Sequence, residues 1–414
     1  MRSAGLSRRG ARLIGASPTP AYLNEHFNRR DDRYCPQRNP DGYLALCVAE
    51  NNLVWDLLAP KVRAPRDVPP EALAYDSMIG AAWFRERLAA FMGARVLGRA
   101  IGPDQLAVLA GAGSVLESLF YALADPGDAV LVPTPSYSGF WVDLETRDEL
   151  TIIPVHCPSE DGFRLTPARL DAALERADRP VRALLYTNPD NPRGAVADAA
   201  ALEEVLGWAE ARQLHLVCDE VYALSVFGAT GFRSVASLRP RLGDAVHIVW
   251  AFSKDFAASG LRCGVLASEN EALLTAIDTL AYWSCCSGDT QRLLGAMIED
   301  DVWLDRYLQE MPRRLSASYQ AVTAALDGAK IPYLPADAGF FVLLDLRAHL
   351  ERPDAQAERA LWWQLLEEAR VNLTPGAACR ITEPGFMRLC YAAVPPAAAV
   401  EGVRRIARVL AARR

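Results

Sequence analysis

A lysine closes one of the short apolar runs of this chain, where it could act as an amine nucleophile. The run 246–250 leads into Ala251-Phe-Ser-Lys254-Asp255. Only three of the 44 basic residues are lysines, so arginine supplies positive charge almost everywhere else. Arginine stays protonated and cannot form a Schiff base, whereas a desolvated lysine can. We therefore predict that Lys254 carries chemistry.

Two further apolar runs end in polar groups that could serve beside such an amine. One ends in Asp219-Glu-Val-Tyr222, which supplies a carboxylate and a phenol. Another ends in the turn Thr187–Gly194, whose two Asn-Pro steps fix the amide of Asn188 or Asn191. A structural salt bridge or a stiff loop explains each motif about equally well when it is considered alone.

A small-residue turn, Gly111-Ala112-Gly113, follows another apolar run and opens a helix. Backbone N–H groups at such a turn can approach a phosphate, although tight packing is an equally good explanation. A phosphate cup, an acid, an amide, a phenol and a desolvated lysine at one sheet edge form a coherent set. Pyridoxal 5′-phosphate (PLP) would use the lysine as a Schiff base and the acid on its ring nitrogen.

Short apolar runs that alternate with helical patterns predict the scaffold for these groups. Strands are expected near 106–110, 129–133, 183–187, 214–218 and 246–250, with helices near 81–92, 114–124 and 198–212. This alternation predicts an α/β fold with a mostly parallel sheet covered on both faces. We predict an N-terminal segment over 1–60, a large domain over 61–300 and a smaller α+β domain over 301–414.

Composition excludes several other classes of protein. Of the 414 residues 51% are hydrophobic and 23% are charged, and the net charge of −7 argues against nucleic-acid or membrane-surface binding. No apolar run reaches the length of a membrane span, and the basic N-terminus lacks a signal-peptide core. The nine cysteines form no C-x-x-C pair, so we expect no metal site and a reduced, cytoplasmic location.

The chain resembles fold-type I PLP-dependent enzymes of aminotransferase class I/II, and most of all the 1-aminocyclopropane-1-carboxylate (ACC) synthase-like branch. The resemblance extends from about Leu6 to Ala392. It rests on Ala49-Glu50-Asn51-Asn52-Leu53, Thr187–Gly194, Cys218–Tyr222, Ser253-Lys254-Asp255, Gly260–Gly264, Asn372–Cys379 and Glu383–Ala392. It implies an aspartate aminotransferase-like fold with a seven-stranded α/β/α domain and a smaller α+β domain.

The resemblance also implies residue roles. Lys254 would hold PLP and then move the substrate Cα proton, and Asp219 would keep the ring nitrogen protonated. Tyr222 and Asn191 would bind the ring oxygen, Tyr137 would stack on the ring, and Arg388 and Glu50 would contact the substrate. The phosphate would be held by Gly111, Ala112, Gly113, Ser253 and Arg262. Tyr75 would reach the neighbouring subunit's phosphate, and Thr290 and Gln291 lie in another segment of cross-subunit contact, so the resemblance implies a homodimer with shared active sites.

Two positions depart from the family pattern. Ala251 replaces a serine that binds the phosphate, and Met78 replaces a tyrosine on the substrate side in ACC synthases. Three functions stay open. The first is elimination of the γ-group of S-adenosylmethionine (SAM) after a quinonoid intermediate, with ring closure or γ-replacement. The second is transamination between an L-amino acid and a 2-keto acid, and the third, disfavoured by Lys254, Asp219 and Arg388 together, is a non-catalytic ligand sensor.

Overall fold

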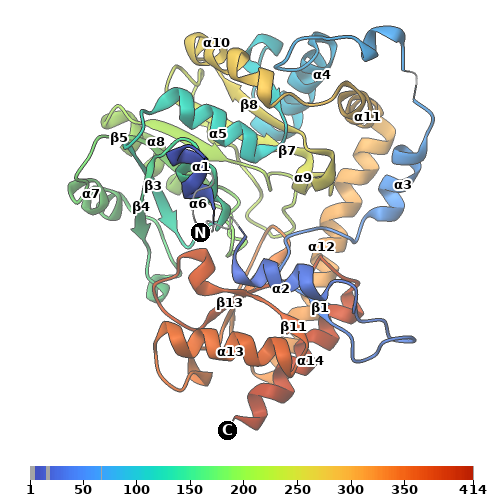
Figure 1. Ribbon diagram of the computed structural model, residues 1–414. Coiled ribbons are helices and arrows are strands. Elements are labelled where there is room, and N and C mark those ends of the chain that lie inside the picture. The colour runs from blue at the N-terminus through green and yellow to red at the C-terminus, as the bar shows by residue number, and fades with distance from the viewer. Residues whose placement is uncertain (1–4, 15–18, 67, 414) are drawn as a thin grey trace.

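A seven-stranded sheet organises the larger part of the computed structural model, which describes residues 5–14, 19–66 and 68–413 (Figure 1). From edge to edge the strands run β2, β8, β7, β6, β5, β3 and β4. β8 is antiparallel to both neighbours, and the other pairs are parallel. The bounds are β2 Leu106–Leu109, β3 Ala129–Thr134, β4 Thr151–His156, β5 Val181–Thr187, β6 His215–Asp219, β7 Val246–Ala251 and β8 Gly264–Ser268. The predicted α/β class is confirmed.

Helices cover both faces of this sheet, as the continuous apolar runs require. In β6, Leu216 and Cys218 belong to one buried cluster, and Val217 between them belongs to the other. Helices α4, α8 and α11 pack on the first face, and α5, α6 and α10 pack on the second. The helices up to this point are α1 Arg8–Leu13, α2 Ala21–Arg29, α3 Trp55–Arg63, α4 Ala82–Met92, α5 Ala112–Leu123, α6 Gly139–Glu145, α7 Pro167–Glu175, α8 Ala199–Ala211, α9 Phe252–Asp255, α10 Glu271–Leu280 and α11 Gly288–Glu299.

A second, four-stranded antiparallel sheet forms the C-terminal part, in the order β12-β13-β10-β9. Its strands are β9 Tyr333–Leu334, β10 Phe341–Asp345, β12 Thr374–Pro375 and β13 Phe386–Cys390, and its helices are α12 Asp301–Ala329, α13 Ala355–Glu367 and α14 Pro396–Ala412. The N-terminal segment joins this part, because β1 (Leu44–Ala45) pairs with β11 (Val371–Asn372) (Figure 1). The domain division stays a prediction, and its boundary at residue 60 falls inside α3.

Two strands of the large sheet have no counterpart among the expected elements. β4 is an edge strand that contains Pro154, and its partly exposed residues dilute the apolar pattern. β8 begins at Gly264, where a Cβ atom would overlap the backbone of Gly111 and Ala112. The glycine therefore lets β8 approach the turn that opens α5.

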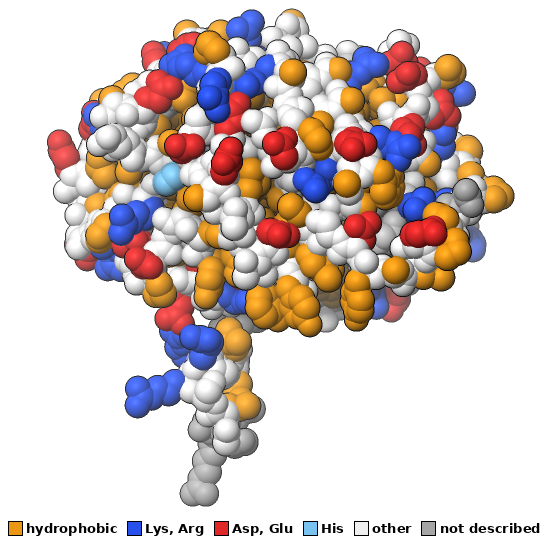
Figure 2. Space-filling view, turned by 90° about the horizontal axis from the view of Figure 1, so that it is seen from above, with side chains coloured by type: hydrophobic (Ala, Val, Ile, Leu, Met, Phe, Trp, Pro, Cys, Tyr) orange, Lys and Arg blue, Asp and Glu red, His pale blue; other side chains and the backbone are white. Residues whose placement is uncertain are grey.

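The surface carries both signs of charge. Acidic and basic side chains are mixed over the face shown in Figure 2. Among the residues that the structure describes, no helix combines the length and the apolar character that a membrane crossing needs.

Candidate active site

A cavity of about 430 Å³ lies at the carboxyl ends of β5, β6 and β7. Its opposite wall comes from the N-terminal segment and from β13. Of the predicted site residues, the cavity is lined by Glu50, Ala112, Gly113, Tyr137, Asn191, Asp219, Tyr222, Ser253, Lys254, Arg262 and Arg388. Carboxyl ends of neighbouring parallel strands meet at one sheet edge, which explains why residues far apart in sequence converge here.

Lys254 lies in α9, the short helix that directly follows β7. Its Nζ donates a hydrogen bond of 2.7 Å to the carbonyl oxygen of Ala49. Burial and then the nearby Arg388 guanidinium lower the pKa of the amine to about 8, against an opposing effect of Glu50. This amine is therefore more readily deprotonated, and so more often nucleophilic, near neutral pH than an ordinary lysine.

Asp219 closes β6 and is 6% exposed. One carboxylate oxygen accepts a hydrogen bond from the backbone N–H of Val221. Burial raises the pKa of this carboxyl to about 7, and the positive charge of Lys254 opposes that rise. A buried carboxylate with so few partners is suited to hold a protonated ring nitrogen, because the cation would offset its desolvation.

The phosphate-binding features lie at the start of α5. Gly111 caps this helix with φ 95°, and a Cβ there would overlap the Arg262 guanidinium. Arg262 donates to the carbonyl oxygens of Ser259 and Ala110 at 3.0 and 3.3 Å. The helix N-terminus, this arginine and Ser253 form a cradle for a phosphate, and Ala251 on the same cavity adds no hydroxyl to it.

Arg388 lies in the middle of β13 and is only 4% exposed. Its Nη1 donates to Oδ1 of Asn191 at 2.8 Å, and its Nη2 donates to the carbonyl oxygen of Cys47 and to Oγ1 of Thr374. Its Nε is buried without a partner. A fixed, desolvated guanidinium with an unused donor is suited to bind a carboxylate.

Two tyrosines supply the aromatic surfaces of the cavity. Tyr222 is 2% exposed and meets Phe340 and Phe341 edge-on. Tyr137 packs edge-on against Phe140 and turns a larger part of its ring to the open space. These neighbours fix both rings, as a stacking surface and a phenol donor require.

Some predicted residues lie away from the cavity. Tyr75 is 97% exposed, and Gly111 stands behind Arg262 rather than on the wall. Gln291 is buried, where its Oε1 accepts from the backbone N–H of Ala81. Thr290 lies in the first turn of α11, where Ser287 caps the helix. Their predicted cross-subunit contacts are not represented in a single chain and stay predictions.

Several lining residues were not anticipated from the sequence. They are Pro20, Tyr22, Leu23, Cys47, Val48, Ala49, Ser138 and Asp143. Asp143 faces the α5 turn, and burial raises its pKa to about 6. Most of the others lie on α2 or on irregular backbone, where no periodic pattern marks a side chain as functional.

The residues present fit PLP. The cradle beside Gly111 suits its phosphate, Asp219 suits its ring nitrogen, and the amine of Lys254, whose pKa is lowered, suits its aldehyde. The buried Nε of Arg388 leaves a donor for the carboxylate of an amino acid bound beside it. The set is thus suited to hold a cofactor and to anchor a substrate in one cavity.

Comparisons with known proteins agree with this assignment. The fold is that of fold-type I PLP-dependent transferases: aspartate aminotransferase from Thermus thermophilus, solved with maleate, aligns with a TM-score of 0.81 over 99% of this chain and 100% of its own, at 22% identity. The aromatic aminotransferase from Pyrococcus horikoshii aligns with a TM-score of 0.79 over 94% of this chain and 99% of its own, at 22% identity.

The sequence comparisons define the family. Residues 54–406 match the family model of aminotransferase class I and II, and the chain belongs to this family of PLP-dependent enzymes. It is 36% identical to 1-aminocyclopropane-1-carboxylate synthase 4 from Oryza sativa subsp. japonica over 92% of this chain and 84% of the relative. It is 34% identical to 1-aminocyclopropane-1-carboxylate synthase from Glycine max over 91% of this chain and 82% of the relative. The suggestion of a non-catalytic sensor is thereby set aside.

Proposed function

We propose that this enzyme acts on SAM and eliminates its γ-substituent as methylthioadenosine. The observation that carries the proposal is the position of Glu50 on the cavity wall, close enough to Lys254 to affect its charge. The sulfonium of SAM is a cation, and a carboxylate on the wall offers it a counter-charge. The ACC synthases among the relatives support the same substrate class.

Each residue has a distinct part in the proposed reaction. When bound, PLP accepts the electron pair left on the substrate Cα after a proton departs. Lys254 takes that proton, and Asp219 keeps a proton on the ring nitrogen so that the electron pair is stabilised. Arg388 binds the substrate α-carboxylate and fixes the Cα–H bond relative to the Lys254 amine.

The Cγ–S bond of SAM can break in two ways. Attack of the Cα electron pair on Cγ would displace methylthioadenosine and give ACC directly. Loss of a Cβ proton together with methylthioadenosine, followed by addition of a nucleophile at Cγ, would give a γ-replacement product. Met78, at the position of a tyrosine in ACC synthases, packs with Ile79 against the second core cluster and offers no hydroxyl to a substrate. This difference favours γ-replacement over simple ring closure.

Transamination is the second candidate, and Met78 supports it too. The tyrosine that ACC synthases have at this position is absent, whereas the groups that transamination would need, Lys254, Asp219 and Arg388, are all present. Lys254, Asp219 and Arg388 would then move an amino group between an L-amino acid and a 2-keto acid.

We also propose that the enzyme works as a homodimer with shared sites. Tyr75, at 97% exposure, lies on a stretch without regular secondary structure, outside its own subunit's cavity. Two other large apolar residues are exposed as well: Leu73 is 85% and Trp283 73% exposed. Burial of these side chains against a second copy would bring Tyr75 to the partner's phosphate cradle.

A product assay with SAM tests the proposed activity, with Lys254→Ala as the control for spontaneous breakdown. Lysine-dependent release of methylthioadenosine is expected, and the accompanying product distinguishes ring closure from γ-replacement. Glu50→Gln should raise KM for SAM more than KM for an uncharged amino acid. No release of methylthioadenosine, with turnover of amino donors and keto acids instead, would establish transamination.

A further inference from the structure

The backbone that faces Lys254 across the cavity has no regular secondary structure between Val48 and Asn52. This stretch nevertheless provides the carbonyl of Ala49, which accepts from Lys254, and the carboxylate of Glu50. A hydrogen-bond acceptor on irregular backbone is only as well placed as the contacts that hold that backbone. Those contacts come from the C-terminal part of the chain and from α12.

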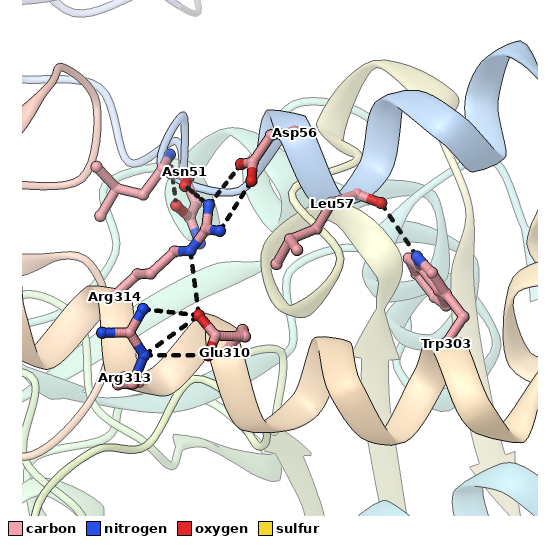
Figure 3. A network of polar contacts seen from close by, with 8 residues as sticks. Asn51, Asp56, Leu57, Trp303, Glu310, Arg313 and Arg314 are labelled. Carbon is pink, nitrogen blue, oxygen red and sulfur yellow. Dashed lines mark hydrogen bonds and ion pairs between the residues drawn. The ribbon is translucent and has the colours of Figure 1, made fainter.

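Two groups of contacts fix the stretch. Asn52 donates through its backbone N–H to the carbonyl of Ala392 at 2.9 Å and through Nδ2 to the carbonyl of Ala393 at 2.7 Å. On the other side, Nη1 of Arg314 donates to the carbonyl of Leu53 at 2.7 Å. Figure 3 shows this arginine reaching from α12 to the start of α3.

Arg314 is itself held by carboxylates on both sides. Its guanidinium contacts both oxygens of Asp56 in the first turn of α3, and Nε lies 3.5 Å from Glu310 on its own helix (Figure 3). The side chain of Arg314 is 25% exposed and that of Asp56 65%, so screening leaves this pair little effect on the stability of the fold. A bidentate pair still fixes direction, because the planar guanidinium has one orientation that satisfies both oxygens.

Helix α3 stays attached to α12 without Arg314. Trp303 donates through Nε1 to the carbonyl of Leu57 at 3.0 Å, and Lys61 pairs with Asp300 (Figure 3 shows the first contact). Loss of the Arg314 side chain would therefore release the carbonyl of Leu53, and the stretch before it would be held only by its contacts with the C-terminal part, while the helices remain packed.

We propose that Arg314 is a positioning residue of the active site, which holds the stretch Ala49–Leu53 so that the Ala49 carbonyl orients the free amine of Lys254. The inference rests on the proposed role of Lys254. Whenever the amine is not bonded to the cofactor, the Ala49 carbonyl is the acceptor that the structure gives it. An amine held in one direction can reach the substrate Cα without a search through rotamers.

The role of Arg314 can be tested without any substrate, by measuring how the rate of PLP uptake depends on pH. The charged and titratable groups that face Lys254 are Arg388, Glu50, Cys390 and Asp219. The carbonyl of Ala49 favours the protonated amine, so displacement of this acceptor lowers the pKa of Lys254. The rate at which apoenzyme takes up PLP, measured from pH 6 to 10, should then show its midpoint about one pH unit lower in Arg314→Ala.

Arg313→Ala is the matched control. Arg313 is the neighbouring arginine on α12, it pairs with Glu310 alone among its recorded contacts, and its side chain is 66% exposed. It should leave the uptake midpoint and kcat at their wild-type values. Arg314→Ala should also lower kcat by about 10-fold, with a smaller change in KM, for any amino acid that the wild type turns over.

The outcomes separate the proposals. Equal midpoints and equal kcat values in the two arginine variants would overturn the role of Arg314, whatever the substrate. If Arg314→Ala does not fold, Asp56→Asn, which removes the charge that directs Arg314, should still lower the midpoint, and an unchanged midpoint would overturn the proposal. Failure of wild-type enzyme to release methylthioadenosine would refute the SAM assignment and leave the uptake result standing.

Discussion

The two walls of the cavity differ in how their residues are held in place. The strand wall, formed by Asp219, Tyr222 and Lys254, follows directly from the ends of β6 and β7. The segment wall, formed by Ala49, Glu50 and Arg388, combines irregular N-terminal backbone with a strand of the second sheet. In the proposed reaction, the strand wall would bind the cofactor and move protons, and the segment wall would contact the substrate. Catalysis and substrate selectivity would then depend on parts of the fold that are held in place by different contacts.

Loss of the lysine from the strand wall should have the largest effect. Lys254→Ala should reduce turnover by at least about 1000-fold, because no other described amine lines the cavity. Borohydride reduction followed by peptide mapping measures attachment of the cofactor directly. Lys61→Arg, which keeps the charge opposite Asp300, is the control. A label found on Lys61 or Lys330 would show that the strand wall is assigned to the wrong residue.

A change on the segment wall should affect binding more than reaction. Arg388→Lys keeps the charge but loses the forked donor, so KM for the amino-acid substrate should rise about 10- to 100-fold, and kcat should fall less. Arg380→Lys is the control, since Arg380 lies over the ring of Trp141 outside the cavity. A drop in kcat at constant KM would mean that the two walls do not divide the work in this way.

Substitution of Tyr75, which would reach the site of the partner subunit, should have a smaller effect on activity. Tyr75→Ala should weaken phosphate binding and lower activity about 10-fold. Hybrid dimers of Tyr75→Ala and Lys254→Ala subunits would contain one intact site, so a random mixture should recover about a quarter of wild-type activity. Activity of the mixture no higher than the average of the two variants would argue against shared sites.

The smallest effect concerns the amino ends of β6 and β7, opposite the cavity. His215 begins β6, and its Nδ1 lies 3.0 Å from Nε2 of the buried His247. Burial lowers the pKa of both, that of His247 to about 3. Protons therefore bind the unfolded chain more strongly. Stability from these groups is complete above the unfolded pKa of about 6.5 and declines as pH falls below it.

Urea unfolding at pH 7 and pH 5.5 tests this effect. The wild type should lose about 1 kcal/mol more of its free energy of unfolding between these values than His247→Gln does. Activity at pH 7 should be unchanged, because the pair lies at the far end of the strand from Asp219. Equal losses would show that His247 does not resist protonation in the fold.

The sequence predicts the strand wall better than the segment wall for a physical reason. Lys254 and Asp219 stand out because a charged residue that closes an apolar run must be paired or functional. Arg388 and Glu50 were anticipated only through resemblance, since neither closes a recognisable run. The carbonyl of Ala49 and the contact of Arg314 with Leu53 escaped prediction, because a backbone acceptor has no signature in residue type. Met78 and Ala251 were found as departures, and the structure places only Ala251 on the cavity.

The scarcity of lysine makes the active site open to chemical labelling. Of the three lysines, Lys61 is ion-paired with Asp300 and Lys330 caps the C-terminus of α12, while Lys254 alone lies in the cavity. An amine-selective reagent thus has few competing targets, and mass spectrometry of the peptide around Lys254 would record directly whether its amine is free. The same reading, taken with inhibitors present, would serve as an occupancy assay that needs no knowledge of the product.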